Sequence, residues 1–141
     1  ILSMILLYIG GKREANTIQK RFKRPNKKQL AALHKMKKIA QEVSLDMISN
    51  NIEAVGEMLD MTWTYKKESN EVSNPRIDML YDKAKLNGAL GGKLLGAGQR
   101  GYMIFIVPQE HQENFVFQMQ KEGCEQVDFA IDWQGLDVRI L

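Results

Sequence analysis

The segment GGKLLGAGQRGYMIFIV, residues 91–107, carries the pattern G-x-G-x-x-G at its centre. In dinucleotide-binding folds this pattern follows a strand and opens a helix, whose N-terminus meets the pyrophosphate. Here residues 102–107 are β-branched and aromatic and end at Pro108, which predicts a strand after the glycines. Residues 93–95 are compatible with a short strand before them. The segment is therefore predicted to be a glycine loop between two strands, which excludes dinucleotide binding.

Two other classes of glycine loop are also excluded. A protein-kinase loop lies between strands, but it must be followed by a lysine strand, an H-R-D loop and a D-F-G motif, and none of these follows here. A P-loop requires G-x-x-x-x-G-K-[ST]. In this chain Gly92-Lys93 is followed by Leu94, and Asn87 stands where the first glycine should be.

Length and composition indicate one globular domain. The chain has 141 residues, of which 44% are hydrophobic. Its one cysteine, Cys124, excludes an internal disulfide and favours a reducing, cytoplasmic compartment. The apolar run 1–9 is too short to span a bilayer, which takes about 20 residues, and it lacks the features of a signal peptide. Because the chain begins without methionine and within this run, we expect it to be part of a longer protein.

The positive charge of the chain is local. The formal net charge is +3, and residues 15–41 hold nine lysine or arginine residues and no acidic one. Such a run binds nucleic acid in some proteins, but Phe22 is its one aromatic residue, and a solvated helical face is the simpler interpretation. His34 and His111 are far apart and have no ligand neighbours at metal-binding spacing, so no metal site is predicted.

Periodicity and turn residues predict an α+β fold. Asn26 and the pair Asn74-Pro75 are typical helix starts, Asn87-Gly88 is a typical helix end, and Asn50-Asn51 interrupts a long apolar repeat. That repeat predicts either two helices in a hairpin or one broken helix. The further predicted elements are strands at 1–9, 127–133 and 138–141 and helices at 12–22 and 109–122. We predict an antiparallel sheet with helices on one face, a ferredoxin-like sandwich with an added helical hairpin.

Several segments resemble one enzyme family. GALGGKLLGAGQRGYMIFIV (88–107) resembles the third conserved motif of the GHMP kinase superfamily, where such a loop joins two strands of the C-terminal domain. LLYIGGKREA (6–15), residues 63–98 and FAIDWQGLDVRIL (129–141) are similar to the D-glycero-D-manno-heptose 7-phosphate kinase branch. The resemblance extends over residues 1–141, which would be a GHMP kinase C-terminal domain.

The resemblance implies a two-domain, ATP- and magnesium-dependent kinase of a sugar or sugar phosphate, with its active site between the domains. Its N-terminal domain would hold the catalytic carboxylate, the metal ligands and the main phosphate loop, and it would be the partner of this chain. No catalytic residue is therefore predicted here, and the chain alone is expected to be inactive. The alternatives are a stand-alone α+β ligand-binding or regulatory module and a basic RNA-binding domain.

The resemblance also implies nucleotide-supporting residues in the glycine loop. Glycines permit positive φ and close backbone approach, and their N–H groups can face anionic oxygens. The residues predicted to support the nucleotide are Gly92, Gly96, Ala97, Gly98 and Gly101. Gln99-Arg100 replace two glycines of the family pattern. Both side chains would point to solvent, or obstruct the neighbouring loop, or Arg100 would contribute a cation to a phosphate.

Four cations are candidates for substrate binding: Lys12, Arg13, Lys66 and Arg100. Lys12 and Arg13 follow the first strand, where the heptose kinase branch has a basic residue near the sugar-phosphate site, although a solvated helix start explains them equally well. Lys66 or Lys67 would face the cleft from the end of an amphipathic helix, while Trp63 is predicted to pack in the core.

Overall fold

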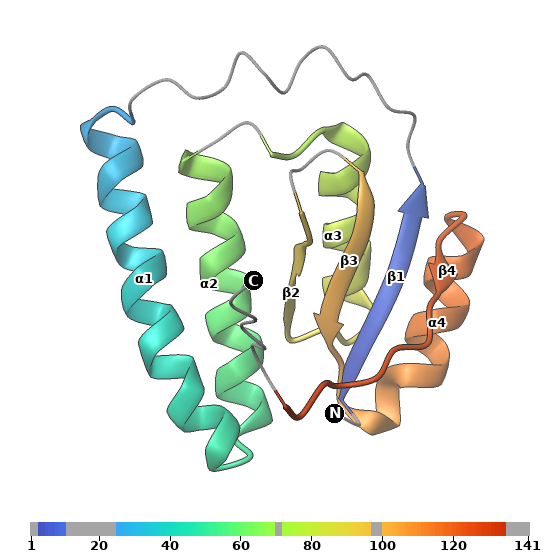
Figure 1. Cartoon of the computed structure of the whole chain (residues 1–141). Coiled ribbons are helices and arrows are strands. Elements are labelled where there is room, and N and C mark those ends of the chain that lie inside the picture. Colours follow the sequence, from blue (N-terminus) through green and yellow to red (C-terminus); the bar gives the residue numbers. More distant parts are fainter. Residues whose placement is uncertain (1–2, 11–24, 70–71, 97–99, 135–141) are drawn as a thin grey trace, which may run out of the picture.

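The structure is an antiparallel sheet with helices around it (Figure 1). This computed structural model describes residues 3–10, 25–69, 72–96 and 100–134. The elements in chain order are β1 (Met4–Gly10), α1 (Lys27–Ile48), α2 (Ile52–Ser69), α3 (Pro75–Leu86), β2 (Gly91–Leu94), β3 (Gly101–Ile106), the 3₁₀ turn η2 (Gln109–His111), α4 (Gln112–Lys121) and β4 (Glu125–Gln126). The strand order is β2-β3-β1-β4, and every neighbouring pair is antiparallel. The predicted α+β class is confirmed.

The hydrophobic core lies between the sheet and α3 and α4. In Figure 1 these two helices lie behind the sheet, α2 lies beside β2, and α1 lies outside α2. The core includes Leu7, Leu94 and Phe105 from three strands and Leu80 and Phe115 from the two helices. On the opposite face of the sheet, strand alternation leaves partly exposed side chains that are mostly apolar or aromatic, among them Leu6, Tyr8 and Tyr102. The predicted arrangement of helices on one face, with an added hairpin, therefore holds.

Helix boundaries follow the predicted capping residues. The Asn26 side chain accepts a hydrogen bond from the Gln29 N–H, and the Gln29 side chain accepts one from the Asn26 N–H, which is a full capping box. Asn74 caps α3, with Pro75 in its first turn. The long apolar repeat forms two helices rather than one, because Asn50 turns the chain with a φ of 57°.

The apolar repeat of α1 is only partly buried. Ala32 and Ile39 are buried against α2, but Leu33 and Met47, which belong to the same apolar repeat, are exposed. A helix that packs against a single neighbour buries a narrow stripe, so a wider apolar face stays in contact with solvent. No helix among the described residues is long and apolar enough to cross a membrane.

The strand predicted at 127–133 is wrong. The observed strand β4 is two residues long and comes earlier, at Glu125–Gln126, and one further hydrogen bond joins the Val127 N–H to the Leu6 carbonyl at 2.9 Å. Residues 127–134 have no regular secondary structure. Their β-forming side chains find no core, and Trp133 is 79% exposed. The helix predicted at 12–22 and the strand predicted at 138–141 lie outside the described residues.

Two glycines bring α2 against β2. Gly56 of α2 and Gly91 of β2 approach so closely that a Cβ on Gly91 would lie 1.9 Å from the Gly56 carbonyl oxygen. Next to them the Tyr81 hydroxyl donates to Asp60 Oδ1 at 2.6 Å and accepts from the Gly92 N–H at 3.2 Å. These contacts hold α2, α3 and β2 in one block, which positions the loop that follows β2.

Candidate functional site

The glycine loop leaves the sheet between β2 and β3. The Leu95 N–H donates to the Tyr102 carbonyl at 2.8 Å, which closes the loop at its base. Gly96 has a φ of +75° and Gly101 a φ of +99°, and a Cβ built on either would have open space around it. Glycine is therefore needed at these positions for backbone conformation rather than for packing. Ala97 and Gly98 lie outside the described residues.

Gly92 differs from the loop glycines. It lies within β2 and is buried, and a Cβ there would lie 2.4 Å from a ring carbon of Phe105. Its N–H and its carbonyl both contact the Tyr81 hydroxyl, at 3.2 and 3.3 Å. The packing of the sheet thus accounts for this glycine, and its predicted support of a nucleotide stays a prediction.

Lys66 lies at the base of the loop. Its Nζ donates to the Leu94 carbonyl at 3.2 Å, and its side chain is half-buried between α2 and β2. Burial, and then the charge of Lys93, lower the pKa of Lys66 below that of an ordinary lysine. Lys67, the other candidate on this helix, is exposed and pairs with Asp78 at 3.4 Å.

Arg100 occupies the end of the loop, directly before β3. It is half-buried, and no hydrogen bond or ion pair involves it among the described residues. Gly10, the last residue of β1, is in register with Gly101, so β1 ends beside this loop. Lys12 and Arg13 follow that strand but lie outside the described residues. The structure therefore brings Lys66, Gly96, Arg100 and Gly101 to one end of the sheet.

Sequence analysis did not single out Lys93 or the indole N–H of Trp63. Lys93 belongs to the quoted glycine segment, and the alternation of β2 could have placed it on the face opposite the buried Leu94. Trp63 packs in the core as predicted, at 1% exposure, but its Nε1 has no acceptor among the described residues. No feature of the sequence signals an unpaired indole donor.

The acidic groups near these elements are engaged by cations or hydroxyls. Asp60 contacts the Tyr81 hydroxyl and Lys85, and Asp78 contacts Lys67 and accepts a hydrogen bond from Ser73 at 2.8 Å. Among the described residues no group of three His, Cys, Asp or Glu side chains is arranged to hold a metal ion. The described end of the sheet thus carries the cations Lys66, Lys93 and Arg100, and no acid–base pair lies there among the described residues.

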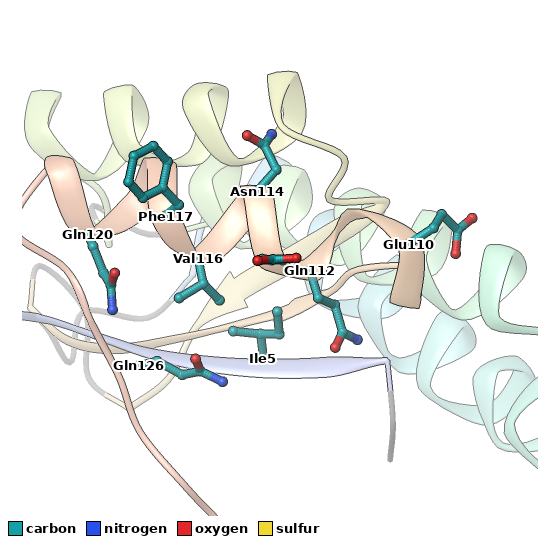
Figure 2. Close-up of a pocket in the computed structure, with 9 residues that line it drawn as sticks. Ile5, Glu110, Gln112, Asn114, Val116, Phe117, Gln120 and Gln126 are labelled. Carbon is teal, nitrogen blue, oxygen red and sulfur yellow. The ribbon is translucent and has the colours of Figure 1, made fainter.

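A separate hollow of about 710 Å³ lies under α4 (Figure 2). It is lined by polar and apolar side chains of η2 and α4, with Ile5 of β1 and Gln126 of β4 on the opposite side. None of the predicted site residues that the structure describes lines this hollow.

Fold and loop together define an α+β domain that presents a glycine turn at one end of an antiparallel sheet, beside cations that no described carboxylate pairs. Residues 31–125 match the family of GHMP kinase C-terminal domains, and the chain belongs to this family. It is similar to D-glycero-alpha-D-manno-heptose 7-phosphate kinase of Campylobacter jejuni, with 30% identity over 135 residues, or 94% of this chain and 40% of that protein.

Solved structures agree with this assignment. A Campylobacter jejuni protein assigned as a sugar kinase has a TM-score of 0.62 and 26% identity, over 93% of this chain and 37% of that one. Galactokinase of Lactococcus lactis, solved with galactose, has the same fold, with a TM-score of 0.65 and 17% identity over 85% of this chain and 41% of the other. The chain thus spans about two fifths of the length of these relatives.

Proposed function

We propose that this chain is the C-terminal domain of an ATP-dependent kinase that phosphorylates a sugar or sugar phosphate, with a heptose phosphate as the favoured substrate class. The similarity to the heptose 7-phosphate kinase supports the substrate class, because it extends over 94% of this chain. In this proposal the loop between β2 and β3 forms one wall of a cleft, and the N-terminal domain forms the other.

The observation that carries the proposal is the open glycine turn beside a half-buried lysine. A Cβ on Gly96 would meet nothing within 4 Å, so the turn leaves room for a phosphate loop or for phosphate oxygens. Lys66 donates a hydrogen bond to the carbonyl of Leu94, two residues before Gly96, and so places positive charge beside the turn. Phosphoryl transfer depends mainly on positioning and charge stabilisation, so such a wall contributes without an acid or base of its own.

Magnesium fits this proposal only through residues beyond the described ones. The described residues offer no cluster of metal ligands, so the ligands would belong to the N-terminal domain. When bound, Mg²⁺ would neutralise charge on the phosphates. This chain's own part would be to orient the phosphates and to limit their exposure to water.

The test is ADP release by the full-length protein that contains this chain, measured with ATP and a panel of heptose, hexose and sugar phosphates. Gly96→Val is expected to weaken nucleotide binding. Gly123→Val is the matched control, because Gly123 also has a positive φ, +77°, but ends α4 instead of bordering the loop. If no sugar or sugar phosphate stimulates ADP release, the kinase proposal is wrong and a ligand-binding module is favoured. Equal nucleotide affinity in both folded variants would refute the role of the loop.

A further inference from the structure

Two lysines from different elements lie near the end of β2, at the sheet edge along which α2 packs. Lys66 reaches this edge from the last turn of α2 and donates to the Leu94 carbonyl. Lys93 lies on β2 itself, and its side chain is on the sheet face opposite the fully buried Leu94. Lys66 Nζ lies 3.2 Å from the carbonyl oxygen of Leu94, the residue that follows Lys93, and burial first and then the charge of Lys93 lower the pKa of Lys66.

This pair of charges has no carboxylate partner among the described residues. The other described lysines of α2 and α3 have one each: Lys67 pairs with Asp78, Lys83 with Glu122 and Lys85 with Asp60. Two like charges that are partly removed from water disfavour each other. An anion between them would offset both the repulsion and the loss of hydration.

Two further features belong to the same segments of α2 and β2. Trp63 lies one turn before Lys66 on α2, and its buried Nε1 donor has no partner among the described residues. Unpaired buried donors are rare in folded proteins and call for a specific explanation. Lys93 is also followed within three residues by the turn at Gly96, where a Cβ would meet nothing within 4 Å. Two lysines without a described carboxylate partner and the glycine turn at Gly96 therefore lie close together along the chain at the end of β2.

We propose that Lys66 and Lys93 together bind a doubly charged terminal phosphate group at the edge of β2. Lysine binds phosphate as a point charge and needs no planar geometry, so two flexible side chains from different elements can converge on one group. The inference deepens the proposed kinase function and rests on it for the source of the phosphate, which is the sugar substrate or the nucleotide. The pairing of the two lysines is independent of that source.

The test uses this chain with isotope-labelled lysines, observed by NMR. Inorganic phosphate, a hexose 6-phosphate and ADP are titrated separately, without metal. The side-chain signals of Lys66 and Lys93 are expected to shift together, while the signal of Lys37, an exposed lysine on α1, stays in place. Lys66→Met and Lys93→Met should each weaken phosphate binding by about tenfold, and Lys66→Arg should restore most of it. Lys37→Met is the matched control and should change nothing.

The three titrations identify the source of the phosphate. Tighter binding of the hexose phosphate than of ADP indicates the substrate, and the reverse order indicates the nucleotide. The proposal is overturned if neither lysine signal shifts, or if both folded methionine variants bind phosphate within twofold of wild type. This outcome differs from failure of the kinase proposal. If the full-length protein releases ADP and both methionine variants release it equally well, only the proposed lysine site is refuted. Phosphate binding at the pair without any ADP release removes only the kinase.

Discussion

Gly91→Ala should be among the most damaging single-methyl additions to this chain. The new Cβ would lie 1.9 Å from the Gly56 carbonyl oxygen and 2.9 Å from the Asp60 nitrogen, and ordinary contact begins at 3.4 Å. Both obstacles are backbone atoms of α2, so a rotamer change cannot relieve the clash. The helix has to move away from β2, which also disturbs the Tyr81 hydrogen bonds beside it. Overpacking of this kind costs about 3 kcal/mol of unfolding free energy, at the upper end of measured cases.

Gly96→Ala provides the matched comparison. The same methyl group there meets nothing within 4 Å, and its cost comes from the φ of +75°, about 1 kcal/mol. The measurement is urea unfolding of both variants and the wild-type chain, followed by circular dichroism. A Gly91→Ala variant as stable as Gly96→Ala, or more stable, would refute the inference that the α2–β2 contact requires backbone-to-backbone approach.

Further predictions concern Tyr81, Asn26 and the basic run. Tyr81→Phe should lower the unfolding free energy by about 1–3 kcal/mol in the same urea assay, because the Gly92 N–H and Asp60 lose a buried partner. Burial and the bond to Asp60 raise the pKa of Tyr81, so the stability it contributes is complete below about pH 10 and is lost as the pH rises beyond it. Urea midpoints that are flat from pH 9 to 11 would contradict this. Asn26→Ala should cost about 1 kcal/mol through loss of the capping box, with helix content read by circular dichroism. The basic run 15–41 should bind RNA or DNA only weakly, at roughly 10⁻⁴–10⁻⁶ M in a fluorescence anisotropy assay at physiological salt, and sub-micromolar, sequence-dependent binding would revive the nucleic-acid hypothesis.

The parts of the fold that sequence predicts well are those governed by local chemistry. Asn26 and Asn74 start helices because their side chains accept hydrogen bonds from backbone N–H groups three residues later. Such N-cap residues can be recognised directly in the sequence. The strand after the glycine loop was predictable because its β-branched and aromatic residues are bounded by Gly101 and Pro108. The apolar face of α3 was also predictable, since every member of its helical repeat is buried.

The sequence-based predictions fail where packing between distant segments determines the local structure. Residues 127–133 have strand-forming composition, but no neighbouring element covers them, so propensity alone does not produce a strand. Leu33 fits the helical repeat of α1 and is exposed, because no second neighbour packs against that side. At the candidate site, the glycine loop and Lys66 could be singled out from the sequence. The association of Lys66 with Lys93 depends on how α2 lies along β2, which no local pattern encodes.

The contacts along β2 also protect the edge of the sheet from pairing with strands of other molecules. β2 is an edge strand, and edge strands with free backbone groups recruit strands from other molecules and seed aggregation. Here the Gly92 N–H and carbonyl are held by the Tyr81 hydroxyl, and the Leu94 carbonyl is held by the Lys66 ammonium. At the other edge β4 is only two residues long and offers little length for pairing. Side chains from two helices thus terminate the hydrogen-bond ladder at this edge. We therefore expect Tyr81 to contribute to the solubility of the chain in addition to its stability.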